Sequence, residues 1–325
     1  MTSLAAALAA GPRRLELATL PTPLHLAPRL SEHLGVPIWF KRDDLTGVGL
    51  GGNKVRTLEY LLADALDRDC DCLVTGAGPQ SNWTMLAALT AIRCDLDPYV
   101  ACYGDPTPAW GNLLLHRGLG TTVTWTGDPE RSSVDAAMAA VAERLRGEGR
   151  RPYVVPRGGA TSLGALGYVR ATLELADQLD AAGVGARSLW LATGSGGTTA
   201  GLVAGAALLA TAYDVVGVTV SRPDVGAHVS ELARGAAALL GLESALPAAD
   251  VRGGWIGPAY GEPSPEGAAA ADLVARTESV FLDPVFAAKA MAALVEACRS
   301  GRERGPVVFL VSGGAPTLFA PEVVT

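Results

Sequence analysis

Short apolar runs alternate with helix-like patterns along almost the whole chain, and this alternation limits the possible folds more than any other feature. Strands are predicted at residues 38–41, 72–75, 98–102, 121–125, 152–155, 188–192, 215–220 and 307–311. Helices are predicted at residues 53–68, 82–92, 133–146, 163–179, 198–211, 225–240 and 286–299. Because several strands are apolar throughout, helices should cover both of their faces. We therefore predict an α/β protein with parallel sheets, whose ligands bind at the carboxyl ends of strands.

The length of the chain allows two domains. With 325 residues, 49% of them hydrophobic, each of two domains could build its own core. No long linker separates them, so the glycine-rich stretches near 46–52 and 157–167 are the predicted boundaries. Residues 49–164 are predicted to form a small domain, and residues 1–48 together with 165–325 a large one. Each is expected to hold a twisted, mostly parallel sheet flanked by helices.

Charge and composition exclude several classes of function. The net charge is −7 and no run of Lys or Arg interrupts it, so we expect no nucleic acid as partner. The Ala/Leu stretch near the start of the chain has no basic segment before it, and charged residues follow at once. Neither a signal peptide nor a membrane span is therefore expected.

The cysteines are few and odd in number, which favours reduced thiols and a cytoplasmic location. They are Cys70, Cys72, Cys94, Cys102 and Cys298. Only one residue separates the first two, but no second Cys or His pair lies nearby, and the histidines are scattered along the chain. We therefore predict buried or half-buried thiols and no metal site.

A glycine-rich loop follows the predicted strand 188–192 and has the composition of a phosphate-binding site. Its sequence is Thr193-Gly194-Ser195-Gly196-Gly197-Thr198-Thr199-Ala200-Gly201. Glycines let backbone N–H groups converge on an anion, and the hydroxyl side chains add donors at the start of a helix. A dinucleotide fingerprint fits less well, because Thr199 stands where its third glycine belongs and the loop lies in mid-chain. No Walker sequence is present either, whereas a purely structural turn stays open.

A second glycine-rich turn, Gly51-Gly52-Asn53-Lys54, places a lysine at the start of a predicted helix. Most lysines are solvated surface residues, but the positive end of a helix dipole does not favour a merely structural lysine. Positive potential there would lower the pKa of the amine and favour its neutral, nucleophilic form. An amine suited to a Schiff base, together with a phosphate-binding loop, predicts pyridoxal 5′-phosphate (PLP) in the cleft between the domains.

Two further polar segments lie at strand ends. Gln80-Ser81-Asn82 follows the predicted strand 72–75 and offers backbone donors to a substrate carboxylate. Taken alone, however, this segment is better interpreted as an ordinary helix N-cap. Ser312 closes the last predicted strand and is equally typical of a turn.

Seven segments occur in an order that resembles a known enzyme family. They are KRDDLTGVGLGGNKVRTLEYLLADAL, GAGPQSNWT, PRGGATSLGALGYV, TGSGGTTAG, GPAYG, LDPVFAAKAM and VSGGAPTLF. Together they resemble the family of D-cysteine desulfhydrase and 1-aminocyclopropane-1-carboxylate (ACC) deaminase, fold-type II PLP enzymes related in architecture to the tryptophan synthase β subunit. The resemblance runs from about Leu20 to Phe319. It implies a PLP-dependent enzyme that acts on a small amino acid and forms a homodimer.

The resemblance implies a role for each matching position. Lys54 matches the lysine that binds PLP covalently, and Asn82 matches the side chain that binds the phenolic oxygen of PLP. Ser81 is similar to the serine near the substrate carboxylate and Cα, and Tyr260 to one of two tyrosines that face the substrate. The catalytic residues are thus expected to be Lys54, Ser81 and Tyr260, while Ser312 matches a hydroxyl residue that contacts the pyridine nitrogen. The phosphate loop of the family matches Gly194, Ser195, Gly196, Gly197 and Thr198.

Four positions depart from the family pattern. Trp83 replaces a His or Gln, and Phe286 replaces the second tyrosine. Ala287 replaces the Glu of ACC deaminases, and Val311 replaces a His that is common in desulfhydrases. Without Glu at position 287 the carboxylate beside the ring nitrogen is missing, which disfavours the opening of a cyclopropane ring. Trp83 and Phe286 should make the substrate pocket more apolar and shift its substrate.

These observations favour a PLP-dependent lyase that performs α,β-elimination on a small amino acid, similar to D-cysteine desulfhydrase but with a shifted substrate. Three alternatives stay open. The first is a β-replacement synthase, which shares the first half of the reaction. The others are an ACC deaminase and a PLP-binding protein that Trp83 and Phe286 have silenced.

Overall fold

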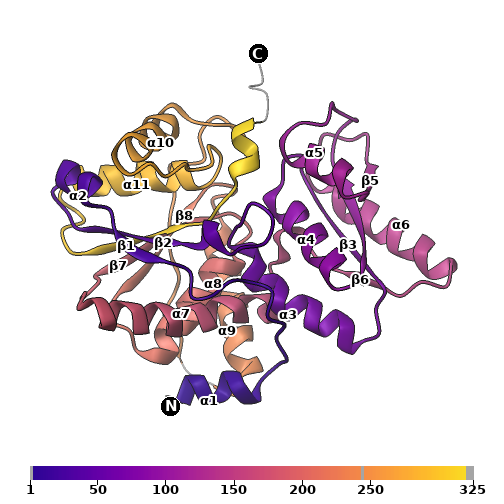
Figure 1. The fold of residues 1–325 in the computed structure, drawn as a ribbon, viewed down its shortest axis with the longest axis horizontal. Coiled ribbons are helices and arrows are strands. Elements are labelled where there is room, and N and C mark those ends of the chain that lie inside the picture. The colour runs from indigo at the N-terminus through magenta and orange to yellow at the C-terminus, as the bar shows by residue number, and fades with distance from the viewer. Residues whose placement is uncertain (1–2, 243–244, 320–325) are drawn as a thin grey trace.

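The computed structural model describes residues 3–242 and 245–319, which contain two mostly parallel sheets (Figure 1). The larger sheet has six strands in the order β1-β2-β10-β7-β8-β9. All neighbouring strands in it are parallel except β1 and β2, which are antiparallel. Its strands are β1 (Leu24–Leu26), β2 (Ile38–Arg42), β7 (Ser188–Thr193), β8 (Asp214–Thr219), β9 (Asp250–Arg252) and β10 (Val307–Val311).

Two hydrophobic cores lie on opposite faces of the larger sheet, because successive residues of a strand point to opposite sides. Leu189 and Leu191 of β7 pack into one core, and Trp190 between them packs into the other. The helices over the first core are α1 (Ser3–Ala10), α7 (Ser162–Ala182), α8 (Gly197–Leu209) and α9 (Val225–Leu239). The helices over the second core are α2 (Pro28–Leu34), α10 (Pro265–Glu278) and α11 (Ala287–Arg299).

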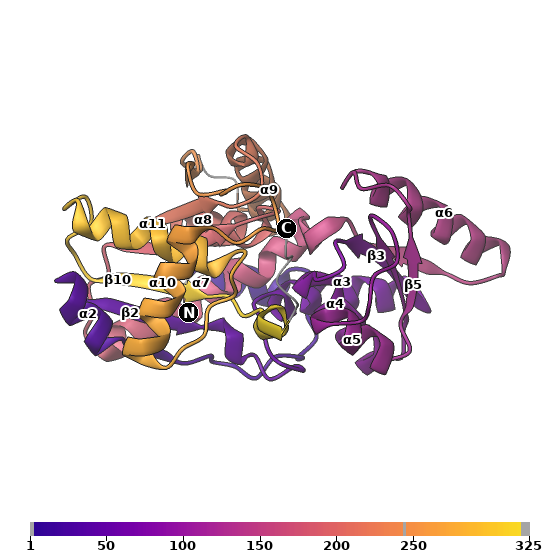
Figure 2. The same ribbon diagram turned by 90° about the horizontal axis from the view of Figure 1, so that it is seen from above.

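The smaller sheet has four parallel strands in the order β5-β4-β3-β6. Its strands are β3 (Cys72–Ala77), β4 (Asp97–Cys102), β5 (Thr122–Trp125) and β6 (Pro152–Val154). One face is covered by α3 (Lys54–Asp67), α4 (Asn82–Arg93) and α5 (Gly111–Gly118), and the other by α6 (Ser133–Gly147). Figure 2 shows α6 as the outermost helix on this side of the molecule.

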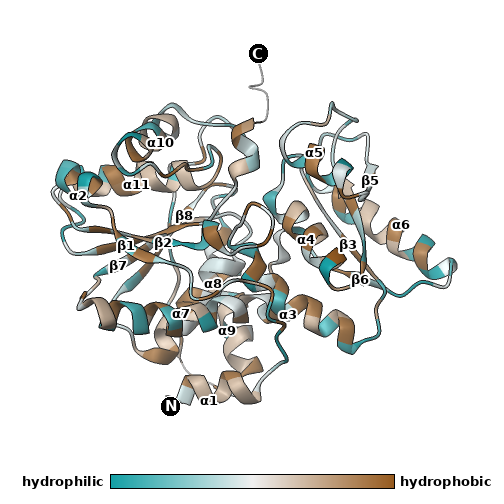
Figure 3. Cartoon of the chain, in the orientation of Figure 1, coloured by the Kyte–Doolittle hydropathy of each residue, from teal (hydrophilic) through white to brown (hydrophobic). Residues whose placement is uncertain are grey.

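Local chemistry at the helix ends agrees with these bounds. Thr161 caps α7, since its hydroxyl accepts a 2.9 Å hydrogen bond from the Gly164 N–H. Gly183 ends the same helix in the left-handed conformation that a residue without Cβ adopts most easily. Figure 3 shows hydrophobic segments along α3 and α4 and hydrophilic ones at the outer ends of α2 and α6. Leu58 and Leu62 of α3 pack into the same core as Leu73 of β3, so this helix turns an apolar side toward the smaller sheet.

The predicted fold class is confirmed, and every predicted strand and helix is present with ends that differ by no more than three residues. The sequence analysis missed β1, β9, α1, α2, α5 and α10. The two strands are three-residue pieces at the edges of the larger sheet, too short for an alternating pattern. No helix among residues 3–242 and 245–319 is long and apolar enough to cross a membrane.

The domain boundaries at 49 and 164 stay a prediction. All four strands of the smaller sheet lie between residues 72 and 154, whereas the strands of the larger sheet come from both flanking parts of the chain. Helix α3 packs against α4 and also against α7, so it contacts elements of both sheets. The segments that follow the carboxyl ends of β3, β7 and β10 meet near the first turn of this helix.

Candidate active site

A cavity of about 850 Å³ lies at the carboxyl ends of the parallel strands, where ligands bind in α/β proteins. It brings together nearly all of the residues that the sequence selected. Those that line it are Lys54, Ser81, Asn82, Trp83, Gly194, Ser195, Gly196, Thr198, Tyr260, Phe286 and Ser312. Gly197 does not line the cavity but begins α8 directly beside it. Segments up to 258 residues apart in the sequence therefore share one site.

The turn before Lys54 holds its shape because only glycine fits there. Gly51 and Gly52 have φ values of +75° and +144°, and a Cβ on Gly51 would lie 1.7 Å from the carbonyl oxygen of Asp44. The hydroxyl of Thr46 accepts a hydrogen bond from the Gly52 N–H and donates one to its carbonyl, both at 3.0 Å. Lys54 is then the first residue of α3 and points its amine to the cavity.

Lys54 differs from the other lysines of the chain, which are Lys41 and Lys289. Lys41 donates to the carbonyl of Thr22 at 2.8 Å, and Lys289 donates to the carbonyl of Ile256 at 2.5 Å. Within the described parts of the chain, the Lys54 amine makes neither a hydrogen bond nor an ion pair. Burial lowers the pKa of Lys54 to about 8. The predicted direction is right, and desolvation by burial causes the shift.

The loop after β7 has the form of an anion-binding site. Gly196 has a φ of +95° and precedes the first turn of α8, whose unpaired N–H groups are available to a phosphate. A hydrogen bond of 2.7 Å from the Ser221 hydroxyl to the carbonyl of Gly194 fixes the start of the loop. No acidic side chain belongs to the loop, so nothing in it opposes a phosphate. The loop and the Lys54 amine on one cavity wall fit the two ends of PLP.

Ser81 and Asn82 lie where α4 begins and also line the cavity. The hydroxyl of Ser81 accepts from the Thr84 N–H at 3.4 Å, so the predicted N-cap is confirmed, and the residue also lines the cavity. The Asn82 side-chain oxygen accepts a 2.8 Å hydrogen bond from the amide of Asn112. The Asn82 amino group donates no hydrogen bond to another described residue. Asn112 is fully buried, and the sequence analysis missed it because it lies 30 residues away in an unrecognised helix, α5.

The aromatic departures from the family pattern form part of the cavity wall. The indole N–H of Trp83 donates to the Thr75 hydroxyl at 2.8 Å, so this polar group has a partner and the ring presents an apolar surface. Gly159 allows the ring to approach, since a Cβ there would lie 2.6 Å from it. Phe286 meets Tyr260 edge to face, with ring centroids 6.2 Å apart. Both aromatic substitutions therefore fit the backbone around them.

A buried carboxylate that the sequence analysis did not select, Asp283, also lines the cavity. Its two oxygens accept hydrogen bonds from the N–H groups of Val285, Phe286 and Ala287, at 3.1, 2.7 and 2.9 Å. Burial nevertheless raises the pKa of Asp283 to about 6. Ala287 itself is buried in the core and does not line the cavity. The pattern Asp-Pro before a predicted helix is a signal that could have identified this residue.

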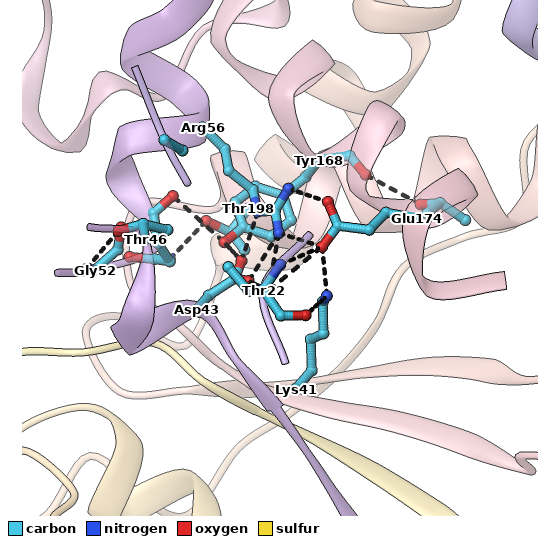
Figure 4. A network of polar contacts seen from close by, with 12 residues as sticks. Thr22, Lys41, Asp43, Thr46, Gly52, Arg56, Tyr168, Glu174 and Thr198 are labelled. Atoms are coloured by element: carbon cyan, nitrogen blue, oxygen red, sulfur yellow. Dashed lines mark hydrogen bonds and ion pairs between the residues drawn. The ribbon is translucent and has the colours of Figure 1, made fainter. Parts of the chain in front are cut away.

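A buried ionic network anchors the helix that carries Lys54 (Figure 4). Arg56 donates to both oxygens of Asp43, at 2.9 and 3.0 Å, and to both oxygens of Glu174, at 2.8 and 2.9 Å. Tyr168 donates to Asp43 at 2.5 Å and approaches the carbonyl of Asn53 at 3.3 Å. The network therefore ties α3 to β2 and α7 just beside Lys54.

Each charge in this network stabilises the others. Burial alone would raise the pKa of Asp43, but the Arg56 guanidinium, Lys41 and the Thr22 hydroxyl together more than offset it, so the pKa is lowered. The same guanidinium holds the pKa of Glu174 below its usual value. Removing one partner of a buried ion pair leaves an uncompensated charge, at a cost of about 3–5 kcal/mol. The first turn of α3 is consequently a rigid support for the lysine.

Comparison with known proteins agrees with this chemistry. The family model described as a pyridoxal-phosphate dependent enzyme matches residues 15–313. The D-cysteine desulfhydrases of Salmonella newport (strain SL254) and Serratia proteamaculans (strain 568) are each 40% identical over 321 residues. These matches cover 94% of this chain and 95% of each relative. The site and fold thus define a PLP-dependent enzyme, as predicted.

Solved structures lead to the same group of proteins. A crystal structure described as an ACC deaminase homologue has a TM-score of 0.92 at 35% identity, covering 98% of this chain and 97% of the other. The processed form of threonine deaminase isoform 2 from Solanum lycopersicum has a TM-score of 0.67 at 20% identity, covering 96% and 83%, and shares the fold. The chain belongs to the family of PLP-dependent enzymes that includes D-cysteine desulfhydrase and ACC deaminase.

Proposed function

We propose that the protein is a lyase that performs α,β-elimination on a small amino acid with a leaving group on Cβ. The observation that carries the proposal is that the Lys54 amine and the Gly194–Gly197 turn face one cavity. PLP bound there withdraws electrons from the substrate Cα and so acidifies its proton. The D-cysteine desulfhydrases, 40% identical to this chain, are named for a reaction of this kind.

Lys54 is the general base of the proposed reaction, since a pKa of about 8 leaves part of its amine neutral near neutral pH. It takes the proton from Cα, and the electron pair of that bond moves between Cα and Cβ. The pair of the Cβ–S bond leaves with the sulfur. Tyr260 supplies the proton for the leaving sulfur: burial raises the pKa of its phenol, although Arg131 and Arg157 act in the opposite direction.

The remaining cavity residues bind and orient. The N-terminal turn of α4 at Ser81 receives the substrate carboxylate, and the free amino group of Asn82 binds the phenolic oxygen of PLP. Ser312 would hold the pyridine nitrogen of PLP, while Trp83 and Phe286 line the cavity with apolar surface. With these two aromatic rings in place, we propose a substrate that differs from D-cysteine in its side chain.

The proposal is tested with PLP-loaded protein and four compounds: D-cysteine, L-cysteine, β-chloro-D-alanine and ACC. Pyruvate, sulfide and 2-oxobutyrate are measured separately. We expect pyruvate from β-chloro-D-alanine, and pyruvate with an equal amount of sulfide from any cysteine that is accepted. Formation of 2-oxobutyrate from ACC alone would instead establish an ACC deaminase. Pyruvate that falls when a second thiol is added, with a new amino acid formed, would establish a β-replacement synthase.

The proposed protein is a cytoplasmic homodimer whose two domains divide at about residues 49 and 164. All five cysteines are free thiols, which supports a reducing compartment. The dimer follows from the family resemblance. Light scattering on the purified protein measures its mass, and a monomer at micromolar concentration contradicts this part of the proposal.

A further inference from the structure

Arg131 lies on the cavity wall in the connection between β5 and α6, and the proposed reaction assigns its guanidinium no ligand to bind. Its guanidinium carbon lies 3.4 Å from the centre of the Tyr260 ring. Tyr260 belongs to the connection between β9 and α10, so segments from both sheets meet at this contact. The stacked geometry fixes the guanidinium beside the tyrosine that faces the substrate.

Among the described residues Arg131 has no acidic partner, unlike the other arginines of the cavity wall. Arg157 makes two hydrogen bonds with Asp135, at 3.1 and 2.9 Å, and Arg222 has Asp224 at 3.7 Å. Across residues 3–242 and 245–319, no carboxylate lies within 4.0 Å of the Arg131 guanidinium. Its neighbour in sequence, Glu130, also lines the cavity but is exposed and forms no ion pair with it.

The contact with Tyr260 uses only part of the guanidinium. The Tyr260 ring lies against the group and its phenol accepts a side-chain hydrogen bond from it, whereas an arginine guanidinium carries five N–H donors. Two of these donors match the two oxygens of a carboxylate or a similar oxyanion. A cation that faces a cavity without a carboxylate partner is therefore suited to an anionic part of a ligand.

Neither end of the cofactor complex supplies that anion. In the proposed function the phosphate of PLP lies at the loop that begins at Gly194, where Phe286 packs, and Tyr260 packs on Phe286 in turn. The substrate α-carboxylate is received at Ser81, on the start of α4, in the proposed function. A third anionic position is left beside Tyr260, where the side chain of the substrate ends.

We propose that Arg131 is a specificity-determining residue and that the substrate is an amino acid whose β-substituent ends in an oxyanion, such as a carboxylate. This inference rests on the proposed function and names its substrate class. The charged end of the β-substituent binds the N–H edge of Arg131. The sulfur attached to Cβ lies on the inner side, where Tyr260 protonates it when the Cβ–S bond breaks.

The test compares two ligands of equal size and shape on the PLP-loaded protein. S-carboxymethylcysteine carries a carboxylate, and S-carbamoylmethylcysteine has a neutral amide in its place. Dissociation constants are measured for both enantiomers from the absorbance change of bound PLP, so turnover is not required. We expect the more tightly bound enantiomer of S-carboxymethylcysteine to have a dissociation constant roughly tenfold lower than that of the corresponding amide, because its carboxylate forms charge-assisted hydrogen bonds.

The variant Arg131→Gln is expected to weaken binding of the acid about tenfold and leave binding of the amide unchanged. Arg252→Gln is the matched control, because Arg252 also stacks on an aromatic ring, 4.6 Å from that of Trp190, but does not line the cavity. Arg252→Gln should prefer the acid to the amide as strongly as the unmodified protein does. Arg131→Lys keeps the positive charge without the planar fork, so it should keep part of the preference for the acid. This variant provides the test if Arg131→Gln does not fold.

Equal affinity for acid and amide, or no binding of either, overturns the inference. The inference is also overturned if Arg131→Gln weakens the binding of acid and amide by the same factor. Arg131 would then bind the α-carboxylate, which both ligands carry. The two proposals fail separately. If the acid binds more tightly than the amide but no compound yields pyruvate, the elimination is refuted and the anion site is supported. If β-chloro-D-alanine yields pyruvate but acid and amide bind equally, the elimination is supported and the anion site is refuted.

Discussion

The side-chain amide of Asn53 donates a 3.1 Å hydrogen bond to the hydroxyl of Thr198, 145 residues further along the chain. Asn53 immediately precedes the lysine, and Thr198 belongs to the phosphate loop. The N–H of Asn53 also donates to the carbonyl of Ser312 at 2.9 Å. The three segments that the sequence assigned to one cofactor are therefore joined directly by hydrogen bonds. These hydrogen bonds hold the three segments at fixed distances from one another.

We expect borohydride reduction of the PLP-loaded protein to attach the cofactor to Lys54. The amine of Lys54 has a pKa of about 8 and no partner in the described parts of the chain, while Lys41 and Lys289 donate to carbonyl groups. Peptide mapping by mass spectrometry identifies the modified lysine. Lys54→Ala should lose the absorbance of covalently bound PLP and about 10²–10⁴-fold in rate. A reduced adduct on either of the other lysines contradicts the assignment.

The lowered pKa of Lys54 also predicts how fast the protein without cofactor takes up PLP. Only the neutral amine attacks an aldehyde, and below its pKa the neutral fraction falls tenfold for each pH unit. With a pKa of about 8, the covalent step should speed up nearly tenfold between about pH 6.5 and 7.5 and level off above about 8.5. Stopped-flow absorbance measures the rate. Pyridoxine phosphate, which has no aldehyde, serves as the control and should lack this step. A rate that still rises at pH 10 would place the pKa at its ordinary value.

Tyr168→Phe tests whether the ionic network supports the lysine-bearing helix. The change removes the hydroxyl that donates to Asp43 at 2.5 Å, and hydrogen bonds to charged groups contribute about 1.5–3 kcal/mol. We expect a loss of that size in the free energy of unfolding, measured with urea, and weaker PLP binding in equilibrium dialysis. Tyr213→Phe is the control, because its buried hydroxyl has no hydrogen-bond partner among the described residues. Equal effects of the two variants would show that the network has no special role.

Most of the fold could be predicted because its central elements carry strong local patterns. Strand β10 was predicted with its observed bounds, since five consecutive apolar residues stand between turns. The antiparallel strand β1 could not be found in this way. Its three residues, Leu24–Leu26, alternate too briefly, and pairing with β2 decides their conformation.

The site was predictable where glycine marked a turn and unpredictable where a side chain acts through tertiary contacts. The loops at Lys54 and Gly194 are recognisable by their composition. Asn112 gives no such signal, because its role depends on α5 lying beside α4 so that its amide reaches Asn82. Arg131 looks like a surface residue in the sequence, and only its stacking on Tyr260 shows that it faces the cavity.

Two opposing effects act on the pKa of Asp283, and the titration of this group shows which of them is larger. Three N–H groups at the start of α11 stabilise its ionised form, while burial favours the neutral form and raises the pKa to about 6. If burial prevails, the unfolded chain releases this proton near pH 4 and the folded protein only near pH 6. The folded state then binds more protons in this window, so the group lowers stability as the pH rises from about 4 to 6.

Asp283→Asn removes this titrating group. Comparison with the unmodified protein therefore shows whether the group raises or lowers stability as the pH rises. We expect the free energy of unfolding of the unmodified protein, relative to Asp283→Asn, to fall by about 1–3 kcal/mol between pH 4 and 6 and to stay constant above. Asp224→Asn is the control for the Asp→Asn change itself, since Asp224 also stands at a helix start but its side chain caps no N–H group. Urea unfolding at several pH values gives both curves. A relative stability that rises with pH would show that the N–H groups of α11 outweigh burial, and Asp283 would then be ionised on the cavity wall at neutral pH.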